Sequence, residues 1–170
     1  MNPEKRRKQI LDEISKPEAL VSASVLANNL GVSRQVIVGD IALLRAQGHD
    51  IIATTRGYMM PKFKELGQYV GKIACRHTPE NTISELYAIV DMGATVLDII
   101  VEHELYGEIT GNLNLMSRED VDNFIEKVKT QEIKLLSVLT DGVHLHTIAC
   151  RDKHHFDQVQ KALREKDFTL

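Results

Sequence analysis

Three residues, Gly31-Val32-Ser33, place the strongest constraint on how the first third of this chain can fold. Gly31 can end one helix in a left-handed conformation, and Ser33 is suited to cap the next helix. That next helix would bury Ile37, Ile41 and Leu44, which are spaced to lie on one face. Two amphipathic helices joined by so short a turn predict a helix-turn-helix.

A β-hairpin is predicted directly after these helices. Its turn is Thr54-Thr55-Arg56-Gly57, between two short apolar runs. A further helix over residues 3–15 precedes the two helices of the helix-turn-helix. We therefore expect a winged helix-turn-helix domain over residues 1–60, in which the hairpin is the wing.

The exposed face of the helix that begins after Ser33 carries side chains that suit DNA. Arg34 can pair with guanine and Gln35 with adenine, and Ser33 with the neighbouring amides can hold a phosphate. A helical module that contacts only protein is the alternative, but the turn, the caps and the wing together favour DNA. The residues predicted to contact double-stranded DNA are Ser33, Arg34, Gln35, Val38, Arg45 and Arg56.

Charge divides the chain at about the same place. Residues 1–60 hold eight Lys and Arg against six Asp and Glu, whereas residues 61–170 hold thirteen against eighteen. The first part can therefore approach a polyanion that the second part would repel. No apolar run is long enough to span a membrane. The absence of a signal sequence and the presence of only two cysteines favour the cytoplasm.

Strand and helix patterns alternate after a connector, Pro61–Gly67, in which Phe63 and Leu66 are the expected anchors. The order over residues 67–170 is β-α-β-β-α-β-β-α. Strands are predicted over 69–76, 95–101, 108–115, 134–139 and 143–150, and helices over 80–92, 117–130 and 152–168. This order favours an α+β sandwich, with helices on one face of a mostly antiparallel sheet.

Two histidines on the last predicted strand are candidates for metal binding. His144 and His146 are two residues apart and share one face of the strand, although an exposed polar pair would show the same spacing. His77 follows the first strand and Glu85 lies in the next helix, so both can reach that face. Three imidazoles and one carboxylate suit zinc, nickel, cobalt or iron(II), and are too rich in nitrogen for magnesium or calcium.

The remaining histidines and the cysteines fit structural positions. Cys75 and Cys150 lie in apolar strand patterns that are typical of a core. His49, His154 and His155 fit exposed turns or helix surfaces.

The second part resembles the 3H domain, named for its three histidines, in C-R-H-T-P-E-N-T-I-S-E-L, V-E-H-E-L-Y-G and L-T-D-G-V-H-L-H-T-I. The first part resembles a helix-turn-helix of the biotin-repressor type in S-R-Q-V-I-V-G-D-I-A-L-L-R-A-Q-G-H-D-I-I-A-T-T-R-G-Y. Over residues 5–165 the chain is thus similar to the niacin-responsive transcriptional repressors. Two departures are Gly39, where a helix former is expected, and Glu104, where the family commonly has proline after His103.

The resemblance implies a repressor of genes for NAD biosynthesis or niacin uptake, with nicotinic acid as its effector. It also implies one transition-metal ion, of nickel, zinc or iron, held by His77, Glu85, His144 and His146. Because helix-turn-helix proteins read paired half-sites, we expect a homodimer. The candidate contacts to nicotinate are Arg76, His103 and Arg151.

Two alternatives to an effector-responsive repressor stay open, although we expect no enzymatic activity. One is a regulator that senses the metal alone, without an organic effector. The other is a metal-dependent hydrolase with an accessory helix-turn-helix, because histidines and a carboxylate can hold a metal that activates water.

Overall fold

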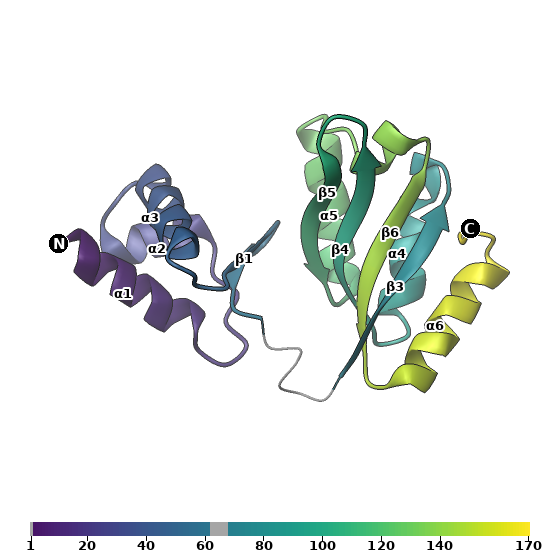
Figure 1. The fold of residues 1–170 in the computed structure, drawn as a ribbon, viewed down its shortest axis with the longest axis horizontal. Helices are drawn as coiled ribbons and strands as arrows, with labels where there is room; N and C mark the ends of the chain where they lie inside the picture. The colour runs from purple at the N-terminus through teal and green to yellow at the C-terminus, as the bar shows by residue number, and fades with distance from the viewer. Residues whose placement is uncertain (1, 62–67) are drawn as a thin grey trace. The chain divides into compact units, whose positions relative to one another are not determined.

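Buried apolar side chains gather into two clusters, one within residues 2–61 and one within residues 68–170. These are the residues that the computed structural model describes. The chain divides accordingly into two units, Met1–Lys62 and Phe63–Leu170 (Figure 1). Each unit has its own core. The predicted anchors Phe63 and Leu66 lie outside the described residues.

Three helices and a hairpin build the N-terminal unit, as the sequence predicts. Gly31 has a φ of 65° and ends the second helix in the left-handed region. The hydroxyl oxygens of Ser22 and Ser33 accept backbone N–H groups and cap the second and third helices. The elements are α1 Pro3–Ile14, α2 Ala23–Leu30, α3 Arg34–Ala46, β1 Ile52–Thr54 and β2 Gly57–Met59.

An ion pair inside this unit fixes α3 against α1. Asp40 lies on the inner side of α3 and is only 4% exposed. Its carboxylate accepts hydrogen bonds from Arg6 at 2.5 and 3.2 Å and pairs with Arg7 at 3.5 Å. The buried carboxylate thus has the partners that it needs, and the opposite face of α3 is left exposed.

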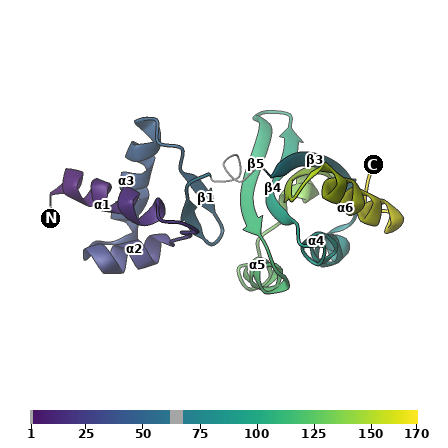
Figure 2. The same cartoon turned by 90° about the horizontal axis from the view of Figure 1, so that it is seen from below.

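A four-stranded antiparallel sheet organises the C-terminal unit, in the order β3-β6-β4-β5. The strands are β3 Tyr69–Arg76, β4 Thr95–His103, β5 Gly107–Leu115 and β6 Val143–Cys150. The helical segments are η1 Pro79–Asn81, α4 Thr82–Val90, α5 Arg118–Thr130, η2 Leu136–Thr140 and α6 Lys153–Glu165. Helices α4, α5 and α6 pack on one face of the sheet, as Figure 2 shows for α4 and α5. The predicted two-domain fold class is confirmed.

The strand predicted over residues 134–139 is wrong, because η2 occupies most of that segment. The N–H group of Gly142 donates to the carbonyl of Ser137 at 2.8 Å and closes a helical turn. The side chain of Leu136 lies over Gly111 of β5, where a β-carbon would come within 3.2 Å of it. The segment therefore packs on the sheet instead of extending it, and the predicted hairpin into β6 does not form.

The last residues pair with β3, which the sequence did not indicate. Thr169 bridges Cys75, and the N–H group of Arg76 donates to the carbonyl of Phe168 at 2.8 Å. The predicted helix to Phe168 instead ends at Glu165. The ring of Phe168 is buried, with its centroid 5.4 Å from that of His77.

His155 is buried, so its predicted exposure is wrong. Its Nε2 donates to the carbonyl of Met92 at 2.6 Å, and its Nδ1 accepts the N–H group of Arg151 at 3.2 Å. The ring thereby joins the start of α6 to the end of α4. No helix within residues 2–61 and 68–170 is both long and apolar enough to cross a membrane.

Gly39→Ala is expected to stabilise the N-terminal unit by about 0.5–1 kcal/mol, because glycine in a helix interior is unfavourable relative to alanine. A β-carbon at Gly39 would meet nothing within 4 Å. Thermal unfolding should show the transition of this unit shifted upward by roughly 4 °C. Gly31→Ala is the matched control. A β-carbon at Gly31 would also meet nothing within 4 Å, but the φ of this residue is positive, so the variant should lower the transition temperature. A lowered transition for Gly39→Ala would contradict the argument.

Candidate metal centre and nucleic-acid surface

Glu85 is a carboxylate in the interior of the C-terminal unit. It lies in the first turn of α4 and is 1% exposed. Three imidazoles meet it through Nε2: His144 lies 3.1 Å from Oε2, and His77 and His146 are in closer contact. A buried carboxylate without such partners would be strongly destabilising, so the histidines account for its position.

Strand alternation and register position the three rings. His144 and His146 project from the same face of β6, towards the helices. Cys75 of β3 is the cross-strand partner of His144, and His77 follows two residues later. The His144 ring centroid lies 4.9 Å from that of His77 and 4.8 Å from that of His146. The four residues predicted as metal ligands therefore meet in one place.

The Nδ1 atom of each ring faces a backbone carbonyl. His77 reaches Thr78 at 2.8 Å, His144 reaches Gly142 at 2.8 Å, and His146 reaches Asp98 at 2.6 Å. Since a carbonyl can only accept, each Nδ1 carries the proton, and each Nε2 of a neutral ring presents a lone pair. Histidines that ligate metals have this second hydrogen bond as a rule.

The lone pairs and the carboxylate face each other and need a cation between them. Nε2 of His77 touches the carboxylate of Glu85 and has no hydrogen-bond partner among the described residues. Burial tends to raise the pKa of Glu85, but His146 and His144 outweigh burial and hold that pKa below its usual range. Burial tends to lower the pKa of His146, and the charge of Glu85 raises it overall. A proton on His146 can supply the cation, and a metal ion would replace it.

The donor set fits a transition metal. Three nitrogens and one carboxylate, all buried, match the preferences of zinc, nickel, cobalt and iron(II). The structure adds the thiol of Cys75, for which the sequence pattern predicts only a position in the core. Cys75 Sγ, a carboxylate oxygen of Glu85 and a ring nitrogen of His144 lie within 4.8 Å of one another. Cys75 shares a strand face with His77, and this alternation is the signal that could have identified it.

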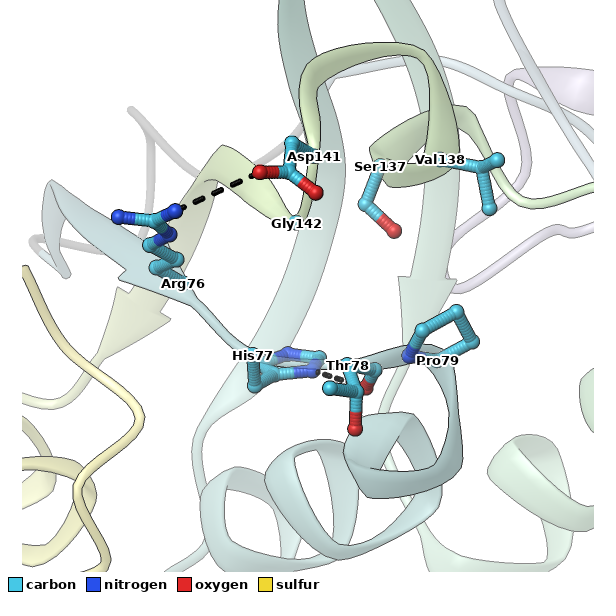
Figure 3. A pocket seen from close by; sticks show the side chains of 8 residues that line it. All are labelled: Arg76, His77, Thr78, Pro79, Ser137, Val138, Asp141 and Gly142. Carbon is cyan, nitrogen blue, oxygen red and sulfur yellow. Dashed lines mark hydrogen bonds and ion pairs between the residues drawn. The ribbon is translucent and has the colours of Figure 1, made fainter.

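A cavity of about 450 Å³ opens on the outer side of His77 (Figure 3). Arg76 and Asp141 form an exposed ion pair at its edge, at 3.5 Å. The lining residues are Arg76, His77, Thr78, Pro79, Ser137, Val138, Asp141 and Gly142. The lining thus includes His77 of the Glu85 cluster and the guanidinium of Arg76, a cation that can pair with a small anion.

The structure does not bring the other two predicted ligand contacts to this cavity. His103 ends β4, and its Nδ1 accepts the N–H group of Leu105 at 3.1 Å, so it organises the turn into β5. Arg151 follows Cys150, which pairs with Tyr69 at the far end of β3 from Arg76. Among the three predicted contacts, only Arg76 lines the cavity.

The residues predicted to contact DNA divide into exposed and partly covered ones. Arg34, Gln35 and Arg45 are exposed on α3, and Arg56 is exposed in the turn of the hairpin. Ser33 is exposed, and its hydroxyl caps the helix. Val38 is half-buried and packs against the helical core, whereas the prediction put it on the open face. The first turn of α3 therefore offers one cation and one amide side by side.

Comparison with known proteins identifies both units. Residues 70–170 match the 3H domain and residues 6–59 match an HTH domain. Transcription repressor NadR of Bacillus subtilis is 43% identical over 162 residues, covering 94% of this chain and 90% of that protein. Probable transcription repressor NiaR of Thermotoga maritima is 38% identical over 167 residues, covering 98% and 94%.

Gly142→Ala should destabilise the C-terminal unit by more than about 1 kcal/mol, because its φ of 88° suits glycine. Its added β-carbon would also lie 2.4 Å from the carbonyl oxygen of His77. Gly93→Ala, with a φ of 80° and nothing within 4 Å, isolates the effect of φ. Denaturant unfolding of both variants should show the larger loss for Gly142→Ala. Equal losses would contradict a role for the close approach to His77.

Proposed function

Since this chain belongs to the family of transcription repressors that join a helix-turn-helix domain to a 3H domain, we propose that nicotinic acid is its effector. The genes under its control would then be those of NAD biosynthesis or niacin uptake. The family expected from the sequence is confirmed. The convergence of three imidazole Nε2 atoms on one buried carboxylate is the observation that supports the metal-binding part of the proposal.

A transition-metal ion is the first part of the proposal. Its ligands would be His77, Glu85, His144 and His146, and when bound it would supply a Lewis acid with room for a further donor. The backbone carbonyls on the three Nδ1 atoms support this assignment, because they fix the ring orientations before any metal arrives.

Nicotinate binding in the cavity beside His77 is the second part. Nicotinate is a small aromatic monocarboxylate, and Arg76 can pair with its carboxylate in place of Asp141. The exposed Arg76–Asp141 pair is weak, so an incoming carboxylate can displace it. The ring nitrogen or the carboxylate would then be the further donor to the metal.

DNA binding by a homodimer is the third part. A single α3 reads a short half-site, and two copies spaced by a helical turn would read a full operator. Arg34 and Gln35 would contact base edges, while Ser33, Arg45 and Arg56 would contact the backbone. Nicotinate would change operator affinity by favouring one arrangement of the two DNA-binding units.

Chelation of the metal is expected to abolish nicotinate binding, because the effector would lose one of its donors. Calorimetry should detect binding to metal-loaded protein and none after chelation. His144→Ala should weaken metal binding by more than about 100-fold, whereas the exposed His154→Ala should not.

The outcomes of this titration separate the candidate functions. Unchanged nicotinate affinity in the metal-free protein would contradict the metal's part in effector binding. Metal binding without any nicotinate binding would favour a regulator that senses the metal alone.

Arg34→Ala is expected to weaken binding to operator DNA by about 5- to 150-fold, which corresponds to the loss of about 1–3 kcal/mol from one bidentate base contact. A gel shift on DNA upstream of NAD-biosynthesis genes, with and without nicotinate, provides the measurement. Arg164→Ala is the control, since Arg164 is exposed on α6 of the other unit. If the Arg34 variant and wild type bind operator DNA with equal affinity, the assignment of α3 as the recognition helix is contradicted.

A further inference from the structure

Cys75 lies beside Glu85 and His144 but is not one of the four residues proposed above as metal ligands. It is fully buried on β3, opposite His144 of β6 and two residues before His77. Its side chain therefore projects from the same face of the sheet as the three histidines.

The surroundings of its sulfur point to a ligand. Sγ lies within 4.8 Å of both a carboxylate oxygen of Glu85 and a ring nitrogen of His144. Its own hydrogen bond is long, at 3.9 Å to the carbonyl of Ile73. Sulfur and nitrogen donors that meet a zinc ion at a tetrahedral angle are about 3.6 Å apart, from bond lengths of about 2.3 Å to sulfur and 2.1 Å to nitrogen. A side-chain shift of at most roughly 1 Å would therefore bring Sγ to bonding distance.

We propose that Cys75 supplies a thiolate to the metal ion held by the histidines and Glu85, so that the protein offers five donors. This inference rests on the proposed metal site. On binding, the Sγ–H bond breaks, the Sγ–metal bond forms, and the proton leaves to solvent. A sulfur donor makes the site favour zinc, nickel or cobalt over the harder manganese and magnesium ions.

Cys150 provides a matched comparison within the same sheet. It is also a buried free thiol, on the same face of β6 as His144. It lies six residues further along the strand, roughly 20 Å away. Burial raises the pKa of both thiols, and the negative charge of Glu85 adds to this at Cys75, as that of Asp152 does at Cys150. Cys150 thus shares the burial and strand face of Cys75 but cannot reach the metal.

Titration of metal-free, reduced full-length protein with cobalt(II) alone tests the proposal. Wild type should develop a sulfur-to-cobalt charge-transfer band in the near ultraviolet, together with the visible bands of bound cobalt. Cys75→Ser should keep visible bands and lose the charge-transfer band, whereas Cys150→Ser should keep both. Calorimetry in two buffers of different ionisation enthalpy should show one proton fewer released by Cys75→Ser. X-ray absorption of zinc-loaded wild type should show one sulfur neighbour at about 2.3 Å.

The result separates this inference from the metal site on which it depends. Visible cobalt bands without a charge-transfer band in wild type would overturn the role of Cys75 and leave the histidine site intact. Cobalt binding that is absent from wild type, or unchanged in His144→Ala, would overturn the proposed metal site and this inference with it. If Cys75→Ser does not fold, the cobalt and zinc spectra of wild type decide, since a missing sulfur signal overturns the proposal.

Discussion

The buried carboxylate of Glu85 is the constraint on which the C-terminal unit depends. A carboxylate at 1% exposure must be compensated, and its partners come from the end of β3 and from β6. The cluster therefore fixes α4 against two neighbouring strands. Three backbone carbonyls accept hydrogen bonds from the Nδ1 atoms of the rings, so the fold itself sets the directions in which the Nε2 atoms point.

The turn formed by Asp141 and Gly142 connects this cluster to the cavity beside it. The carbonyl of Gly142 holds the His144 ring, and its α-carbon lies against the backbone of His77. Asp141 pairs with Arg76 at the cavity edge. Both residues have positive φ, a conformation that suits the glycine and that the surrounding structure must hold in place for the aspartate. In the proposed function, a ligand that displaces Asp141 from Arg76 would act on the residues that orient two metal-site histidines.

Much of the fold and the four proposed metal ligands could be predicted from the sequence, because local signals were strong there. The capping serines and Gly31 marked the helix-turn-helix, and period-two spacing placed His144 and His146 on one face. The segment 134–139 was misassigned because an apolar run does not distinguish a strand from a turn that packs on a sheet. His155 and Phe168 were missed because their burial depends on residues more than sixty positions away, Met92 and His77.

The sequence by itself determined the two units and the histidines that can share a site, since these follow from periodicity, turn chemistry and local motifs. Its motifs also carry the resemblance to the repressor family. Only the tertiary structure decided that His77 and Glu85 meet the histidines of β6 and that Cys75 lies beside them. It also decided that Arg76, rather than His103 or Arg151, borders the cavity. The physical reason is strand register: which residues of β3 and β6 lie opposite each other depends on packing across the whole sheet.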